Sequence, residues 1–326
     1  MKAITVRETA DRPVLELSEI PAPVAGPTEL LVRVCAAGMN RADLVLPKVH
    51  YTAQGTSAII AGYEMSGTVI AMGNRCKGFS IGDRVMAPTR AAFAEQCLVD
   101  HRLAMHAPMS MDLASAAALP AWYVTAHNAL TAQGNLQPGE SVLIQGATSG
   151  VGIATAQMAR ILGAGKIVGI SRSSKRLEQL RDLGVDTLIT ADEGWPEKVK
   201  AATDGHGIDL IIDMVGGGAL SGNIQCAALT GRIIAVGRMG GEKDMLDLDV
   251  VAFKRLTIRG VTFRSRTIEE QAATINTFAQ EMLPLIETGK LEPVIDSVYP
   301  LSGAAEAQEH VRRNAHFGKT LISIDS

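Results

Sequence analysis

The sequence predicts an α/β fold, with a doubly wound parallel sheet of six strands joined to a β-rich domain. Three observations predict it. Residues 141–171 follow the order strand, glycine turn, helix and strand, and strand and helix patterns alternate as far as residue 262. Residues 1–100 instead carry short strand patterns separated by Gly and Pro. Strands that alternate with helices of about 10–15 residues are typical of a parallel sheet with helices on both faces.

The β-rich part has strand patterns at residues 30–34, 67–71 and 84–87. A helical pattern then covers residues 112–132, with Asp112 as its expected cap and an interruption at Pro120. We place the domain boundary in this helical stretch. The sequence thus divides into residues 1–120, residues 121–262 and a final segment, 263–326, that contains a helix at 269–288 and a strand at 318–324.

The second domain has six apolar strand patterns, at residues 142–144, 167–170, 187–189, 208–213, 232–236 and 256–261. Glycines follow several of the expected strand ends, at 216–218, 237, 240 and 241. Parallel sheets bind ligands at the carboxyl ends of their strands. Glycine-rich turns are common, however, so each of these glycines alone says little about a site.

The turn at residues 146–152 carries the strongest functional signal. Gly146, Gly150 and Gly152 lie between an apolar strand pattern and a helical pattern. Glycine lets the main chain approach a pyrophosphate, and the helix N-terminus offers unpaired N–H groups to that anion. The spacing has one residue more than G-x-G-x-x-G, but the strand-turn-helix context predicts a dinucleotide site.

The end of the second strand predicts which dinucleotide binds. An NAD site usually has Asp or Glu about 20 residues after the glycine turn, to bind the ribose 2′-hydroxyl. Here Ser171, Arg172, Ser173 and Lys175 occupy this region, and no carboxylate precedes Glu178. Cations and hydroxyls favour a 2′-phosphate and therefore NADPH. The alternative is a solvated first helical turn that is basic by chance.

Composition narrows the class of protein. The chain has 326 residues, 47% hydrophobic and 20% charged, with a net charge of −3, which indicates a globular protein without a polyanion-binding surface. No apolar run approaches the roughly 18 residues of a membrane span, and the N-terminus lacks a signal-peptide pattern. Its four cysteines form no C-x-x-C pair, so we expect neither a disulfide framework nor a zinc ribbon, and a cytoplasmic location.

Several strings resemble one family over essentially the whole chain. They are NRADL at 40–44, GYEMSG at 62–67, GDRV at 82–85, GATSGVG at 146–152 and NAHFGK at 314–319. The chain resembles the medium-chain dehydrogenase/reductase superfamily, and within it the zinc-free NADPH:quinone oxidoreductase branch of the p53-inducible type. The resemblance implies a Rossmann domain at 121–262, a GroES-like catalytic domain at 1–120, and a segment at 263–326 that returns to the catalytic domain.

The resemblance also bears on metals. Zinc-dependent members of the superfamily bind catalytic zinc through Cys and His, where this sequence has Asn40 and Tyr63. Both are poor zinc ligands, so we expect no metal. Cys35, close to the first of these positions, lies in a strand pattern and is expected in the core. Without a Lewis acid the substrate must accept hydride readily, as quinones and other electron-poor conjugated carbonyls do.

The resemblance implies a substrate pocket lined by Asn40, Asp43 and Tyr51 and facing the nicotinamide. It implies a cofactor site formed by Thr125, Gly146, Ser149, Gly150, Val151, Ser171, Arg172, Ser173, Lys175, Val215, Gly237, Met239 and Asn314. Alternatives remain open. Asn40 and Asp43 can instead cap a helix that begins there, and Tyr51 can be an ordinary loop aromatic. Glu64 is expected to be a structural ion-pair or hydrogen-bond partner rather than an acid.

The expected activity is transfer of reducing equivalents from NADPH to quinones. Two alternatives stay open, which are reduction of an activated carbon–carbon double bond, as in an enone or enoyl thioester, and a non-catalytic NADPH-binding protein. The resemblance implies a homodimer that pairs through the strand at 256–261, an edge that would otherwise invite aggregation. Neither a nucleic acid nor a membrane is expected as a partner.

Overall fold

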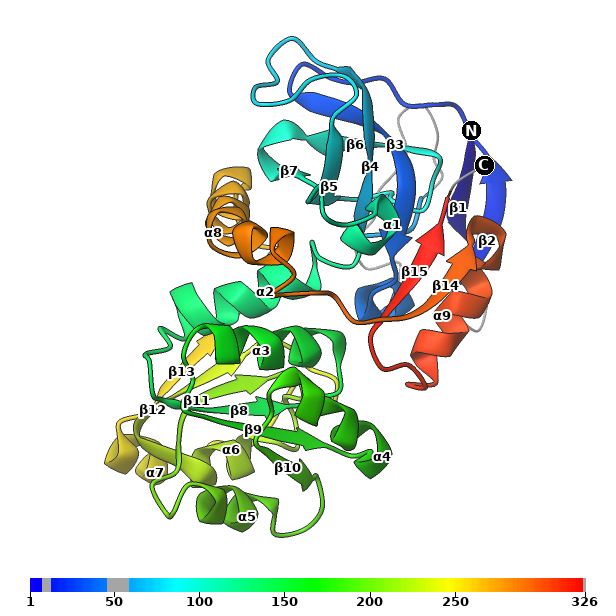
Figure 1. The fold of residues 1–326 in the computed structure, drawn as a ribbon. Coiled ribbons are helices and arrows are strands. Elements are labelled where there is room, and N and C mark those ends of the chain that lie inside the picture. Colours follow the sequence, from blue (N-terminus) through cyan, green and yellow to red (C-terminus); the bar gives the residue numbers. More distant parts are fainter. Residues whose placement is uncertain (8–12, 46–58, 325–326) are drawn as a thin grey trace. The chain divides into compact units, whose positions relative to one another are not determined.

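The computed structural model describes residues 1–7, 13–45 and 59–324, and Figure 1 shows its ribbon. The chain divides into two compact units, Trp122–Arg266 and the combination of Met1–Ala121 with Thr267–Ser326. Each unit is described by itself.

The unit Trp122–Arg266 contains a parallel sheet in the order β10-β9-β8-β11-β12-β13. The chain thus starts in the middle of the sheet, builds one half outwards, and returns to build the other, which is the doubly wound arrangement. The predicted six-stranded sheet is confirmed. Its strands are β8 (Ser141–Gln145), β9 (Lys166–Ser171), β10 (Thr187–Thr190), β11 (Ile208–Asp213), β12 (Ala227–Ala235) and β13 (Thr257–Gly260).

Helices cover both faces of this sheet, with α3 on one face and α5 and α6 on the other (Figure 1). All five residues of β8 are buried, which explains why its pattern is a continuous apolar run rather than an alternation. The helical elements are α2 (Trp122–Asn128), η3 (Ala129–Gln133), α3 (Gly150–Ile161), α4 (Ser174–Leu177), η4 (Glu178–Leu183), α5 (Trp195–Ala202), α6 (Leu220–Cys226) and α7 (Leu248–Lys254).

The other unit is built on a mostly antiparallel sheet in the order β14-β15-β3-β4-β5-β7, with β6 also paired to β3. Its centre, β3, alternates inward residues such as Leu30 and Val32, both 0% exposed, with outward ones. These strands are β3 (Glu29–Gly38), β4 (Glu64–Met72), β5 (Arg84–Pro88), β6 (Gln96–Asp100), β7 (Met105–His106), β14 (Ile295–Pro300) and β15 (Lys319–Ser323). A separate hairpin pairs β1 (Lys2–Arg7) with β2 (Val14–Glu19).

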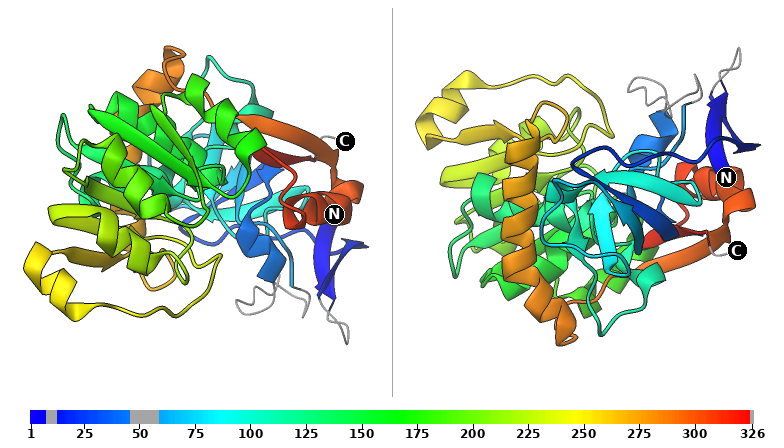
Figure 2. Two further views of the ribbon diagram at one scale, coloured as in Figure 1. Left: turned by 90° about the horizontal axis from the view of Figure 1, so that it is seen from below. Right: turned by 90° about the horizontal axis from the view of Figure 1, so that it is seen from above.

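The end of the chain belongs to this same sheet, because β15 pairs antiparallel with β3, Leu321 opposite Gly38. The remaining elements are η1 (Arg41–Val45), η2 (His101–Leu103), α1 (Leu113–Ala116), α8 (Ile268–Glu287), η5 (Leu301–Gly303) and α9 (Ala304–Arg312). Figure 2 gives two further views of these elements. The expected Asp112 cap is present, since its carboxylate accepts from the Ser115 backbone N–H at 2.9 Å.

Candidate functional site

The glycine turn lies between β8 and α3. Gly146 has φ +72°, a left-handed conformation that favours glycine. Gly150 and Gly152 are required by packing instead, because a Cβ at Gly150 would lie 1.9 Å from Trp122 and one at Gly152 2.6 Å from the Ala147 carbonyl oxygen. Ser149 caps α3 by accepting the Gly152 N–H at 3.2 Å, and the half-buried Val151 is the second residue of the helix. This strand-turn-helix geometry can hold a pyrophosphate.

Loops that follow β11 and β12 meet this turn at the carboxyl edge of the sheet. Side-chain atoms of Val215 and Met239 each lie 3.4 Å from where a Cβ at Gly146 would be. The Gly240 N–H donates to the Val215 carbonyl at 2.8 Å, and the Gly237 N–H donates to that of Asp213 at 3.0 Å. The structure therefore brings together predicted cofactor residues from three separate parts of the sequence.

A buried chain of polar side chains supports this edge. Gln145 donates to Asn223 at 3.0 Å, and Asn223 donates to the Asp213 carboxylate at 3.1 Å. The other Asp213 oxygen accepts the N–H groups of Val215 and Gly216, at 2.7 and 3.0 Å. Burial raises the pKa of Asp213, while these N–H groups lower it. Sequence reasoning missed this chain, although Gln145 and Asp213 are the polar residues that end two apolar strands.

The end of β9 carries the residues expected at a 2′-phosphate. Ser171 is 8% exposed, Ser173 is half-buried, and Arg172 and Lys175 are exposed. The Ser171 hydroxyl lies 2.8 Å from that of Thr148, a residue of the glycine turn that the sequence analysis did not single out. Thr125, also predicted at the cofactor, lies half-buried in α2, the helix whose Trp122 packs against Gly150.

In the other unit, Asn40 belongs to a buried polar cluster with Asp43, Glu64 and Lys319. Asn40 is 8% exposed and the other three are 0% exposed. The Asn40 amide donates to Glu64 Oε1 at 2.7 Å and to the Gly38 carbonyl at 3.2 Å, and its Oδ1 accepts from Lys319 Nζ at 2.9 Å. Both amide hydrogens of Asn40 are therefore used inside the protein.

Asp43 caps the turn that begins at Asn40, which is the capping role that the sequence analysis left open for it. Its Oδ2 accepts the Asn40 backbone N–H at 2.7 Å, whereas the Asn40 side chain caps nothing and points to Glu64 and Lys319. Asp43 Oδ1 accepts no hydrogen bond from any residue that the structure describes. Burial raises the pKa of Asp43 to about 7, against the Asn40 N–H and the Lys319 charge, which lower it.

Glu64 is the structural partner that the sequence analysis expected. It forms an ion pair with Lys319 and also accepts the Ala121 backbone N–H at 2.7 Å. Gly38 makes room for the pair, because a Cβ there would lie 2.4 Å from both Glu64 Oε1 and Lys319 Cε. The sequence analysis did not predict Lys319 as a site residue. The only sequence feature that pointed to it was the Gly-Lys pair at 318–319, within the string that resembles the family.

Comparisons with known proteins give the family. A family model described as alcohol dehydrogenase GroES-like domain matches residues 26–133, and one described as zinc-binding dehydrogenase matches residues 150–286. Human quinone oxidoreductase is 31% identical over 315 residues, which cover 95% of this chain and 94% of that protein. The chain belongs to the medium-chain dehydrogenase/reductase superfamily. The predicted superfamily, and the fold of a Rossmann sheet with a GroES-like domain, are thereby confirmed.

Other relatives agree. Quinone oxidoreductase-like protein 2 homolog of Nematostella vectensis is 29% identical, with 91% of this chain and 82% of that protein covered. Among solved structures, a quinone oxidoreductase of Pseudomonas syringae has a TM-score of 0.86 at 26% identity, covering 99% of this chain and all of the other. An alcohol dehydrogenase superfamily protein of Novosphingobium aromaticivorans has a TM-score of 0.87 at 28% identity, with both chains fully covered. Membership makes this chain an oxidoreductase with a nicotinamide cofactor.

The resemblance described above places a zinc ligand of the zinc-dependent members at the position of Asn40. In this chain the Asn40 oxygen lies 2.9 Å from the Lys319 ammonium, and a buried cation is a poor neighbour for Zn²⁺. Over residues 1–7, 13–45 and 59–324, no group of three or more His, Cys, Asp and Glu side chains could hold a metal.

The same part of the chain contains no helix of the length and apolarity that a membrane span needs.

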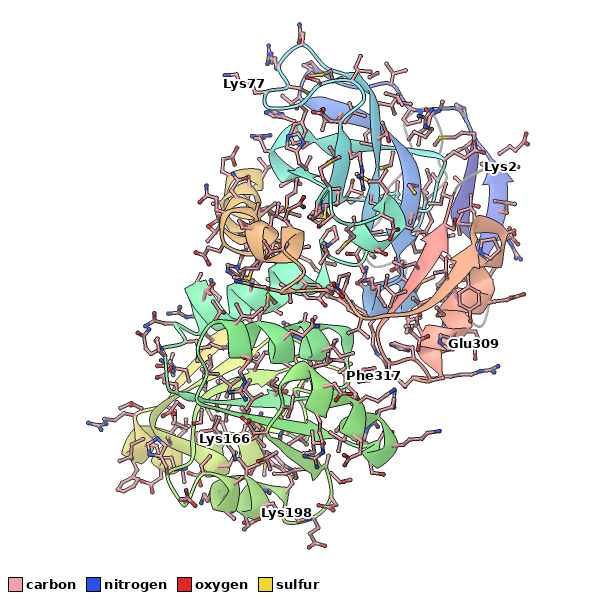
Figure 3. All side chains as sticks on the ribbon, viewed as in Figure 1. Lys2, Lys77, Lys166, Lys198, Glu309 and Phe317 are labelled. Carbon is pink, nitrogen blue, oxygen red and sulfur yellow. The ribbon has the colours of Figure 1, made fainter. Side chains whose placement is uncertain are left out.

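Two predicted residues remain. Asn314 lies in the turn after α9, where its side chain accepts from Arg41 and donates to the Arg312 carbonyl at 3.3 Å. The same turn is fixed by Phe317 (labelled in Figure 3), whose N–H donates to Asp296 at 2.9 Å. Tyr51 lies outside the residues that the structure describes. The functional roles of all the site residues predicted from the sequence, Asn314 and Tyr51 included, stay predictions.

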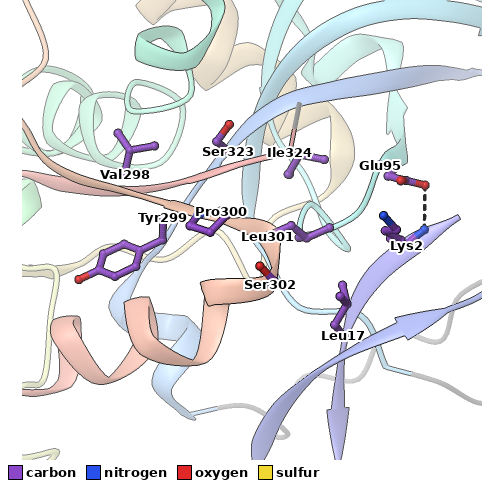
Figure 4. Close-up of a pocket in the computed structure, with 10 residues that line it drawn as sticks. All are labelled: Lys2, Leu17, Glu95, Val298, Tyr299, Pro300, Leu301, Ser302, Ser323 and Ile324. Carbon is purple, nitrogen blue, oxygen red and sulfur yellow. Dashed lines mark hydrogen bonds between the residues drawn. The ribbon is translucent and has the colours of Figure 1, made fainter. Parts of the chain in front are cut away.

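A surface hollow of about 320 Å³ lies near the end of β15 (Figure 4). Its lining includes Leu17, Val298 and Ile324, together with Lys2 and Glu95. The Lys2 backbone N–H donates to the Glu95 carboxylate at 2.8 Å. It contains no residue of the predicted site. We therefore do not assign the site to this hollow.

Proposed function

We propose that this chain is an NADPH-dependent, zinc-independent quinone oxidoreductase that transfers reducing equivalents from NADPH to quinones. The observation that carries the proposal is the buried Asn40–Lys319 contact, at 2.9 Å. The resemblance places a zinc ligand of the zinc-dependent members at the position of Asn40. A substrate reduced without a Lewis acid must accept hydride readily, and quinones do so. The relatives named quinone oxidoreductase, at about 30% identity, support the same conclusion.

NADPH fits the carboxyl edge of the sheet. The N-terminus of α3 would hold the pyrophosphate, with Gly146, Ser149 and Gly150 letting the main chain come close. Ser171, Arg172, Ser173 and Lys175 would bind the 2′-phosphate through hydroxyls and positive charge. When bound, the cofactor supplies the hydride.

We propose that Asn40 and Asp43 support the substrate pocket by holding the 40–45 segment in place. Because both amide hydrogens of Asn40 are used internally and Asp43 is fully buried, the cluster fixes the positions of these two residues. Tyr51 would stack on the flat quinone or donate its hydroxyl to the oxygen that gains negative charge during reduction. The protein thus contributes orientation and hydrogen bonds rather than metal chemistry.

Oxidation of NADPH by the purified protein, followed with a panel of quinones, tests this function. We expect turnover with 1,4-benzoquinone or 9,10-phenanthrenequinone and a preference for NADPH over NADH. A protein that ignores every quinone but reduces an enone or an enoyl thioester would be the reductase of activated double bonds instead. One that binds NADPH and turns over none of these substrates would be a non-catalytic binding protein.

Metal analysis tests zinc independence separately. We expect no stoichiometric zinc in the purified protein and full activity after treatment with a chelator, since Asn40 and Tyr63 replace the sulfur and imidazole ligands. One tightly held zinc ion per chain would contradict the proposed mechanism. The four cysteines form no C-x-x-C pair in the sequence, which supports the proposal of a cytoplasmic location.

A further inference from the structure

Two hydroxyl groups meet where the glycine turn approaches the end of β9. Thr148 Oγ1 lies 2.8 Å from Ser171 Oγ, and each residue is 8% exposed. Ser171 Oγ also accepts the Ser173 backbone N–H at 3.4 Å. This contact links the pyrophosphate turn to the strand end that faces the adenosine ribose in dinucleotide-binding folds.

A count of hydrogens shows what this pair lacks. Two hydroxyls carry two hydrogens, and one of these is used in the bond between them. The Ser173 N–H occupies a lone pair and uses no hydroxyl hydrogen. Among the residues that the structure describes, neither hydroxyl has a further acceptor. Whichever hydroxyl donates to the other, one hydrogen of the pair remains for an external acceptor.

We propose that Thr148 and Ser171 act together as one hydrogen-bond donor to the 2′-phosphate of NADPH, which makes Thr148 a specificity-determining residue. The inference rests on the proposed NADPH site. A phosphate oxygen is the acceptor because Arg172, just after β9, and Lys175, in the following helix α4, are both exposed and supply positive charge. An NAD site has an acceptor carboxylate here, but residues 171–177 contain none.

Equilibrium binding of NADPH and NADH by calorimetry tests this proposal. The variants are Thr148→Val, Ser171→Ala and their combination. Each single variant keeps one hydroxyl hydrogen, so it should weaken NADPH binding only about threefold, whereas the double variant should weaken it about tenfold or more, the usual effect of losing a hydrogen bond to a charged group. NADH binding should hardly change in any of them, because NADH lacks the 2′-phosphate.

Thr155→Val is the matched control. Thr155 is also a threonine close to the glycine turn, but its hydroxyl donates to the Val151 carbonyl at 2.7 Å and it is 0% exposed. Its hydrogen is already used, so this variant should bind NADPH as the wild type does.

Two results would overturn the inference. One is NADPH binding by the double variant within twofold of the wild type, and the other is an equal loss for NADPH and NADH. If the double variant does not fold, Thr148→Val and Thr148→Ser decide, since only the first should lower the preference for NADPH, and an unchanged preference overturns the inference. A wild-type protein that binds neither dinucleotide would instead refute the proposed function, on which the inference rests.

Discussion

Lys319 and Glu64 form an ion pair in which neither side chain is exposed to solvent. The pair joins β15, close to the end of the chain, to β4, and Lys319 also holds the Asn40 amide at 2.9 Å. Removing one partner of a buried pair leaves an uncompensated charge, whereas removing both often costs little. The carboxylates of both Glu64 and Asp43 act on the Lys319 charge. Of the cluster's members, Lys319 is therefore the one whose replacement we expect to lower the free energy of unfolding most.

Lys319→Met should therefore lower the free energy of unfolding by about 3–5 kcal/mol, because it leaves Glu64 charged and buried without its partner. Denaturant unfolding followed by circular dichroism measures the change. The double variant Lys319→Met with Glu64→Gln should lose less than the single variant. A single variant as stable as the wild type would contradict the stabilising role of the ion pair.

Asp43 gives the stability a pH dependence. Burial raises its pKa to about 7 in the folded protein, while a carboxyl in the unfolded chain titrates near pH ~4. Between these values the folded protein holds a proton that the unfolded chain has lost, so stability falls as the pH rises from about 4 to about 7 and stays low above it. At about 1.4 kcal/mol per pH unit, this loss is at most about 4 kcal/mol.

Asp43→Asn should remove this dependence and make the protein more stable than the wild type at pH 8, with little difference at pH 4. Thermal and denaturant unfolding across this range measure it. Three other carboxyl groups have lowered pKa values, those of Asp100, Asp209 and Asp296. Their contribution to the stability of the folded protein is lost only as the pH falls below about 4, outside the range compared here. Asp213, whose pKa is raised, contributes equally to both proteins and cancels in the comparison. Parallel pH profiles for the two proteins would contradict the assignment.

Much of the fold could be predicted because its signals are local. The apolar run at 142–144 is a fully buried strand, and the glycine turn follows it directly, so both are visible in a short window of sequence. The helix predicted at 269–288 is α8, Ile268–Glu287, because its apolar residues recur at helical spacing and Thr267 with Glu270 forms a capping box.

The polar clusters could not be predicted because their partners are distant in sequence. Asn40 and Lys319 lie 279 positions apart, and Gln145 and Asn223 lie 78 apart. Periodicity reports which residues are buried but not which buried polar groups meet. For the same reason Thr148 was overlooked, since its importance depends on Ser171, at the end of the following strand.

Lys175 should separate the two cofactors. Its exposed ammonium would pair with the 2′-phosphate, so Lys175→Ala should raise the Michaelis constant for NADPH by up to about fivefold, the upper end of the effect of an exposed ion pair. The constant for NADH should hardly change. Lys166→Ala is the control, because Lys166 (labelled in Figure 3) begins β9 at the end opposite Ser171, whereas Lys175 lies in α4, just after that strand. Equal changes for both cofactors would contradict the role of Lys175.

Tyr51 tests the substrate side. Tyr51→Ala should cut turnover with 9,10-phenanthrenequinone by up to roughly 10²-fold, the cost of losing one donor to a developing negative charge, and leave NADPH affinity nearly unchanged. Tyr51→Phe keeps the ring and loses only the hydroxyl, so comparing the two separates stacking from hydrogen bonding. Quinone reduction at the wild-type rate in both variants would make Tyr51 a bystander.

The edge of the parallel sheet predicts the oligomeric state. β13 is the last strand of that sheet, and large apolar side chains are exposed on and near it, with Leu229 57%, Phe253 78% and Ile258 40% exposed. An open sheet edge with such neighbours favours pairing with a second copy. We therefore expect a homodimer in sedimentation experiments at micromolar concentration.

Ile258→Lys should convert this dimer to a monomer, because it places a charge on the edge strand, whereas Val298→Lys, on the exposed strand β14 of the other sheet, should leave the dimer intact. A wild-type protein that sediments as a monomer would refute the predicted pairing. A dimer unaffected by Ile258→Lys but broken by Val298→Lys would move the interface to β14, since each substitution adds one charge to only one of the two edges.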